Sequence, residues 1–209
     1  MDLTVKLDFF FRLNTRYTTP MDTMPHWLHV LLWTAGELVF ALVALLPYVF
    51  LVLPKYDAGA LPGFSPLIAN GVNPFLGAAL AALVVAAGMG LAFLLVRMIG
   101  KDKIVTDEIA MLERDFSMFD LVPVFAAAGF AEEFLFRVVC VDLLGPIVAA
   151  ILFTAAHVSY WKQPYLLLNV FVLGLLLGGL YVFTQSLLLC AIAHFVYNMA
   201  IIGLLRSMQ

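Results

Sequence analysis

The apolar residues of this chain gather into six runs, each about as long as a helix that crosses a membrane. A spanning α-helix needs about 20 mostly apolar residues. The runs cover residues 27–53, 74–99, 121–144, 145–161, 164–183 and 187–205. Of the 209 residues, 64% are hydrophobic and 12% are charged, whereas soluble domains average roughly 45–50% and 25%. We therefore predict an all-α, polytopic membrane protein with about six transmembrane helices.

The runs and their connections divide the chain into four segments. Residues 1–26 mix aromatic and basic side chains, which predicts an interfacial segment, with disorder as the alternative. Residues 27–103 hold two N-terminal transmembrane helices. Residues 104–119 alternate apolar and charged positions, as a short amphipathic helix at the interface does. Residues 120–209 hold four spans with short connections, so we expect a compact four-helix bundle.

The basic residues predict the orientation, because Lys and Arg gather in cytoplasmic loops. With the N-terminus in the cytoplasm, nine of the eleven Lys and Arg residues lie on the cytoplasmic side. Lys55 alone lies outside, and Arg137 lies within the bundle. We therefore place both termini in the cytoplasm. The short chain and the lack of targeting extensions favour a prokaryotic cytoplasmic membrane.

The third apolar run carries three charged residues, Glu132, Glu133 and Arg137. On insertion scales, each charge at the bilayer centre costs at least roughly 2.5–3.5 kcal/mol without a partner. Glu133 and Arg137 are four positions apart and share a helix face, so they are predicted to pair. Glu132 lies about 140° around the axis from Arg137. It is therefore free to meet groups on other helices.

The fourth and sixth runs supply the groups that could meet Glu132. His157 follows Phe153 by one turn, and His194 and Asn198 share a face. A carboxylate, two imidazoles and a carboxamide suit hydrolysis by an activated water, because they offer a base, an orienting group and oxyanion donors. Two alternatives remain: the polar groups hold helices together, or they serve transport, proton relay or partner binding.

The intramembrane Glu37 is less clearly placed. It follows Gly36 in the middle of the first run. It could bond to Asn169 or Gln185, lie protonated, or bind substrate.

In this order, the motifs Glu132-Glu133-xxx-Arg137, Phe153-xxx-His157 and His194-xxx-Asn198 resemble those of the CPBP (CAAX protease and bacteriocin-processing, or Abi) family of intramembrane proteases. That family includes type II CAAX prenyl endopeptidases. The resemblance covers roughly residues 120–205. It implies a glutamate-type endopeptidase in which Glu132 and His157 activate water, His194 and Asn198 hold the oxyanion, and Glu133 and Arg137 support the site. One departure is Val138, where many members have glycine.

The resemblance also bears on cofactors and partners. It implies metal-free catalysis, although Glu and His are competent zinc ligands, so zinc stays an alternative. The expected partners are the lipid bilayer and a membrane-embedded or lipidated protein or peptide substrate, with no nucleic acid. Prenylated CAAX proteins, leader or pheromone peptides, and C-terminal sorting anchors all fit. The sequence does not determine the oligomeric state.

Overall fold

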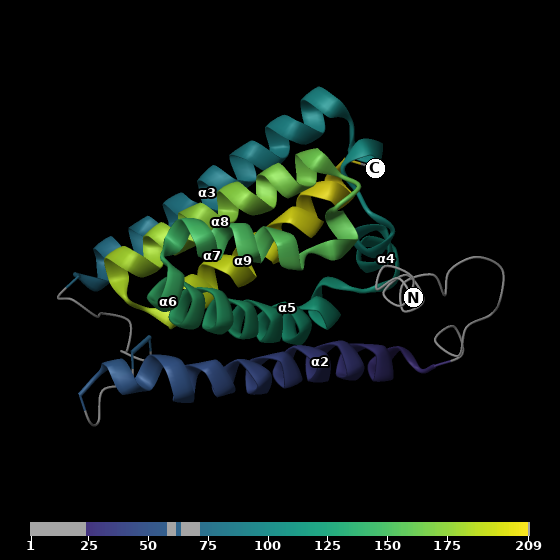
Figure 1. Ribbon diagram of the computed structural model, residues 1–209. Coiled ribbons are helices and arrows are strands. Elements are labelled where there is room, and N and C mark those ends of the chain that lie inside the picture. Colours follow the sequence, from purple (N-terminus) through teal and green to yellow (C-terminus); the bar gives the residue numbers. More distant parts are fainter. Residues whose placement is uncertain (1–23, 58–61, 64–71, 209) are drawn as a thin grey trace, which may run out of the picture.

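The computed structural model describes residues 24–57, 62–63 and 72–208, and these form a bundle of helices (Figure 1). Most of the predicted interfacial segment, residues 1–26, lies outside the described residues. The helices are α2 (His26–Pro47), α3 (Pro74–Ile99), α4 (Asp107–Asp115), α5 (Met118–Glu133), α6 (Asp142–Leu144), α7 (Pro146–Ala156), α8 (Pro164–Thr184) and α9 (Leu187–Ser207). The short segments are η2 (Tyr48–Val52), η3 (Leu53–Lys55), η4 (Lys101–Lys103), η5 (Phe134–Val141) and η6 (Val158–Tyr160). The predicted all-α class is confirmed.

Four described helical stretches are long and apolar enough to cross a membrane: His26–Lys55, α3, α8 and α9. The helix that runs from α5 through the π-helical η5 into α6 is also continuous. It contains Glu132, Glu133 and Arg137, the three charged residues predicted inside the bundle. It is therefore less apolar than the four stretches above. The multi-pass helical architecture therefore agrees with the apolar runs.

Helix α7 is shorter than we predicted from its apolar run, which covers residues 145–161. Its 11 residues span about 16 Å at 1.5 Å per residue, roughly half of the hydrocarbon core. It ends because His157 leaves the helical conformation, with ψ of 61°. The His157 ring nitrogen Nδ1 lies 2.7 Å from the Phe153 carbonyl oxygen, which satisfies a carbonyl left free at the helix end.

The two N-terminal helices lie on opposite sides of the core. Helix α2 packs against α5, whereas α3 packs against α8 and α9 (Figure 1). The first two long helices of the chain thus flank the segment that contains α5, α7, α8 and α9. They do not form a separate layer of their own.

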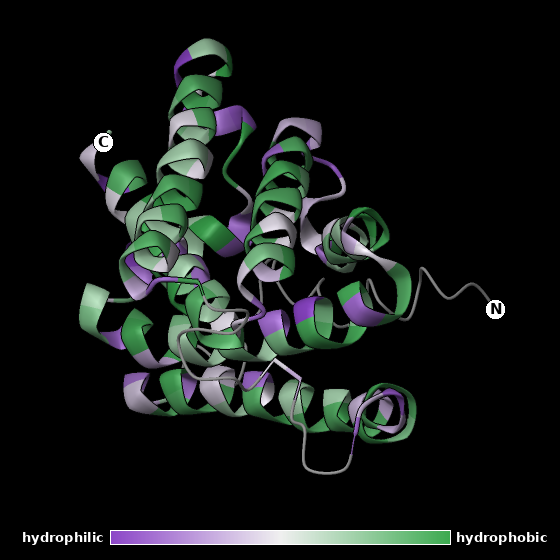
Figure 2. Ribbon diagram, turned by 90° about the vertical axis from the view of Figure 1, so that its left-hand side faces the viewer, coloured by the Kyte–Doolittle hydropathy of each residue, from purple (hydrophilic) through white to green (hydrophobic). Residues whose placement is uncertain are grey.

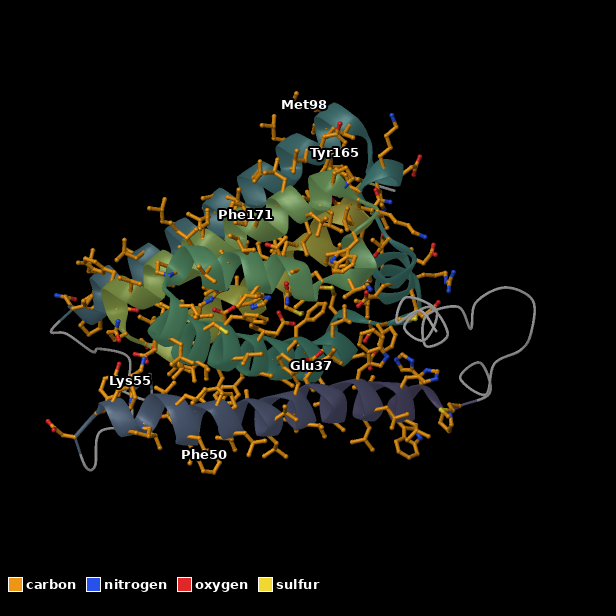
Figure 3. The ribbon with its side chains drawn as sticks, viewed as in Figure 1. Glu37, Phe50, Lys55, Met98, Tyr165 and Phe171 are labelled. Carbon is orange, nitrogen blue, oxygen red and sulfur yellow. The ribbon has the colours of Figure 1, made fainter. Side chains whose placement is uncertain are left out.

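The outer faces of the long helices are apolar (Figure 2). On α2 and η2, Leu42 and Phe50 are 63% and 71% exposed, and Met98 at the end of α3 is 73% exposed. Phe50 and Met98 project away from the bundle (Figure 3). Soluble monomers rarely expose contiguous apolar surface on this scale. Such an apolar surface is suited to contact with lipid.

Helices α7 and α8 approach each other through two glycines. A Cβ atom added to Gly174 would lie 3.2 Å from Phe153 Cδ1, and one added to Gly178 would lie 3.3 Å from Pro146 Cβ. These glycines have the small-xxx-small spacing that allows close helix packing. Their contacts hold the end of α7, and with it His157, against the bundle.

Helix α4 forms where the alternating pattern predicts an amphipathic helix, and it is fastened to the ends of α3 and α9. Arg206 donates hydrogen bonds to the carbonyl oxygens of Glu113 (3.0 Å) and Leu112 (3.2 Å). Lys101 donates to the Glu113 carboxylate (2.5 Å) and to the Leu205 carbonyl (2.7 Å). These bonds fix α4 against the C-terminal end of α9 and the segment that follows α3.

Candidate active site

The ion pair predicted from spacing is present and fully buried. Arg137 Nε donates to Glu133 Oε2 at 2.6 Å, and Arg137 Nη2 lies 3.3 Å from Glu133 Oε1. Both side chains are 0% exposed. Arg137 Nη1 also donates to the Gly174 carbonyl oxygen (3.1 Å), and its guanidinium lies 5.0 Å from the Phe153 ring centre. The pair therefore joins α5 and η5 to α8 and α7.

His194 hydrogen bonds with Glu133, although we expected it to turn toward Glu132. The distance from His194 Nδ1 to Glu133 Oε1 is 2.9 Å. A carboxylate paired with arginine only accepts hydrogen bonds, so Nδ1 carries the proton and donates it. The free nitrogen Nε2 of neutral His194 is then an acceptor. Only the imidazolium form of His194 could donate from Nε2.

Glu132 meets His157 rather than any group on its own helix. Glu132 Oε2 lies 4.0 Å from His157 Nε2, and within the described part of the chain this oxygen is buried without a hydrogen-bond partner. Since the Phe153 carbonyl accepts the proton on His157 Nδ1, Nε2 of neutral His157 is also an acceptor. Neither acceptor carries a proton, so the two atoms do not hydrogen bond with each other directly. One water could donate a proton to each.

Phe153 lies at the centre of these groups. It is 1% exposed, and its ring centre lies 4.7 Å from that of His157 and 5.9 Å from that of His194. Phe136 packs edge-on against it at 5.1 Å. The ring therefore separates the two imidazoles and fixes the position of each.

Asn198 is half-buried on α9, one turn after His194, and so lies on the same face of that helix. Within residues 24–57, 62–63 and 72–208, no hydrogen bond engages its carboxamide. The carboxamide is therefore available to a ligand.

Glu37 does not bond to either partner we had considered. Asn169 hydrogen bonds with Tyr197, and Gln185 donates to backbone carbonyls at the end of α8. Glu37 is half-buried on the side of α2 that faces α5 (Figure 3), and its carboxylate interacts electrostatically with Glu132 and His194. It therefore borders the candidate site.

Two residues that the sequence did not single out also border the site. The Tyr160 ring centre lies 5.2 Å from that of His157, and Glu108 of α4 interacts electrostatically with Glu132 and His157. The fourth run was read as one helix, so Tyr160 had no special position in it. Glu108 was read as part of the charged face of α4. No local signal separates either residue from its neighbours.

The described residues include no group of three or more His, Cys, Asp or Glu side chains arranged to hold a metal ion. The zinc alternative therefore has no ready ligand set in this part of the protein. Cys140 is half-buried and Cys190 is buried, and both are free thiols.

Residues 114–200 match the family model described as Rce1-like, type II CAAX prenyl endopeptidase Rce1-like. The matched segment runs from the end of α4 to α9 and contains all three motifs. The predicted resemblance is confirmed. Neither the curated proteins nor the solved structures gave a match to this chain.

Proposed function

We propose that this chain is a glutamate-type intramembrane endopeptidase, because residues 114–200 match the Rce1-like family model. Its substrate is a membrane-associated protein or peptide. The observation that carries the proposal is the pair of acceptors, Glu132 Oε2 and His157 Nε2, 4.0 Å apart with Oε2 lacking a partner. A carboxylate and an imidazole so placed are suited to activating one water between them.

The proposed reaction is addition of water to a peptide carbonyl. The water oxygen bonds to the carbonyl carbon as one of its protons passes to Glu132, and the carbonyl electron pair moves to oxygen. The tetrahedral centre then collapses, the C–N bond breaks, and the leaving nitrogen takes the proton from Glu132. The new carboxylic acid gives its remaining proton to His157, which releases it to solvent. The products are a carboxylate and an amine.

The other residues take supporting roles in this proposal. Asn198 donates a hydrogen bond to the developing oxyanion. The Nε2 atom of His194 borders the same space. It donates a hydrogen bond to the oxyanion when the imidazole is protonated. Glu133 and Arg137 hold His194 and the centre of the bundle in place. Glu37 faces the substrate from α2.

The half-length of α7 gives water a route to the site. Irregular backbone at membrane depth is tolerated only where it is buried in protein or lines a water-filled cavity. From His157 onward the chain leaves the α-helix, with η6 and a turn before α8 begins at Pro164. Val158 and Trp161 in this stretch are 38% and 57% exposed. We propose that this segment borders a hydrated cavity open to the cytoplasmic side.

The test compares purified wild-type protein with Glu132→Gln and Glu133→Gln on prenylated CAAX peptides and other membrane peptides. Glu132→Gln keeps the shape of the side chain but cannot take a proton. We expect it to fold and bind peptide, with cleavage reduced roughly 10²–10⁴-fold. Asp115→Asn, at an exposed ion pair with Arg114, is the matched control and should cleave normally.

Two outcomes would count against the proposal. If the wild type and Glu132→Gln cleave at equal rates, the cluster is structural or serves transport or partner binding. If Glu132→Gln is active while a well-folded Glu133→Gln is inactive, the enzyme survives but the roles of the two glutamates are reversed.

A further inference from the structure

The candidate site has fewer fixed hydrogen-bond donors than its proposed chemistry needs. The protons on Nδ1 of His157 and His194 are both committed, to the Phe153 carbonyl and to Glu133. Their free nitrogens are acceptors in the neutral rings. Asn198 is then the one predicted residue that donates in every protonation state. Oxyanion sites usually combine more than one donor.

Tyr160 is in the right place to supply a second donor. The turn of η6 closes with a 2.9 Å hydrogen bond from the Tyr160 amide to the His157 carbonyl, which fixes the two residues relative to each other. The Tyr160 ring lies 5.2 Å from the His157 ring and packs against the buried cluster of Phe136, Phe153 and Val170. Its position is therefore set by the same elements that position His157.

The Tyr160 hydroxyl is free to donate. No hydrogen bond engages it within the part of the chain that the structure describes. Tyr160 also interacts electrostatically with Glu108, Glu132 and Tyr197. Its ring adjoins that of His157, the imidazole proposed to activate water together with Glu132.

We propose that the Tyr160 hydroxyl donates a hydrogen bond to the substrate carbonyl oxygen. This hydrogen bond becomes stronger as negative charge develops on that oxygen. The hydroxyl acts there together with Asn198. This inference rests on the proposed endopeptidase function. It assigns a catalytic donor to a residue outside the three motifs.

The experiment measures kcat and KM for wild type, Tyr160→Phe and Tyr160→Leu with one cleaved peptide. Tyr160→Phe keeps the ring contact with His157 and removes only the donor. We expect its kcat to fall at least about ten-fold, toward the 10²–10³-fold typical of a lost oxyanion donor, with KM and melting temperature nearly unchanged. Tyr165→Phe, a half-exposed tyrosine at the start of α8, should match wild type.

A second measurement separates the hydroxyl from the ring. A peptide analogue with a tetrahedral phosphinate at the cleaved bond should bind Tyr160→Phe at least about ten-fold more weakly than wild type, because such analogues mimic the transition state. The unmodified peptide should bind both equally when Glu132→Gln blocks cleavage.

The outcomes separate a failure of the Tyr160 donor role from a failure of the proposed endopeptidase function. If wild type cleaves and Tyr160→Phe cleaves equally well, the donor role is wrong while the protease stands. Loss of activity in Tyr160→Leu alone would mean that only the ring matters, which also overturns the donor role. A wild type that cleaves no peptide and does not bind the analogue would overturn the proposed function and this inference together.

Discussion

At the scale of single residues, two adjacent glutamates have opposite surroundings. Glu133 is fully buried and bonds to Arg137 and His194. Glu132 makes no such bond, and its oxygen Oε2 faces His157 at 4.0 Å. One residue of helical rotation separates a carboxylate with two bonded partners from one whose oxygen Oε2 has none among the described residues. The pair illustrates why residue type alone does not assign a role.

The buried pair predicts a large difference between two arginine substitutions. Arg137→Ala leaves Glu133 buried without its main cation, and breaking a buried pair typically costs roughly 3–5 kcal/mol. We expect lower folded yield and melting temperature in detergent, together with lost activity. Arg114→Ala is the control, since Arg114 is 75% exposed beside Asp115 and should change stability little. Equal melting temperatures for the two variants would contradict the structural role of Arg137.

Removal of metal ions tests the proposed roles of Glu132 and His157. Since Glu132 and His157 are proposed to act on water directly, exhaustive dialysis against a chelator should leave cleavage unchanged. The measurement is activity before and after dialysis, with zinc added back at one equivalent. Activity that is lost and then restored by zinc would recast Glu132, His157 and His194 as metal ligands.

At the scale of elements, the site depends on how α7 ends and how it meets α8. Helix α7 stops at Ala156, so that His157 leaves the helix and turns its Nε2 toward Glu132. The glycine contacts of α8 let Phe153 and Ala150 approach closely. A half-length helix and a close crossing together place the His157 imidazole opposite Glu132.

Two glycines of α8 give a matched test of this crossing. A side chain at Gly174 would collide with Phe153 and Ala150, whereas nothing lies within 4 Å of a Cβ at Gly179. Overpacking typically costs roughly 1–3 kcal/mol. We expect Gly174→Leu to lower the melting temperature and to reduce cleavage, because Phe153 holds both imidazoles. Gly179→Leu should do neither, and a similar loss in both variants would show that the α7–α8 contact is not what matters.

At the scale of the whole molecule, the two ends of the bundle differ in their basic residues. Lys101, Glu113 and Arg206 form one network where α3, α4 and α9 meet. Lys55 pairs with Asp142 (3.0 Å) at the other end, where Figure 3 shows it. Because basic residues concentrate on the cytoplasmic side, we propose that the α4 end faces the cytoplasm, with both chain termini there.

Cysteine labelling tests this orientation. In a background with Cys140 and Cys190 replaced by alanine, a membrane-impermeant thiol reagent added from outside should label Asp57→Cys. It should not label Lys103→Cys until the membrane is permeabilised. Both positions are exposed, so access to the reagent depends on sidedness. The reverse labelling pattern would overturn the proposed orientation.

The sequence by itself determined the features that depend on neighbours along the chain. Pro74 and Gly100 bound an apolar run, and α3 has the bounds Pro74–Ile99. Ser117 and Asp120 form a capping box that starts α5. The pairing of Glu133 with Arg137 followed from their spacing of four, because residues so spaced meet on any helix.

Only the tertiary structure decided which distant groups meet. His194 bonds to Glu133 across 61 positions of sequence, rather than turning to Glu132. The packing of α7 on α8 placed Phe153 between two imidazoles, and the early end of α7 brought Tyr160 beside His157. Helical periodicity specifies which residues share a face. It does not specify how far one helix is rotated or shifted against the next, because side-chain packing between helices sets that geometry.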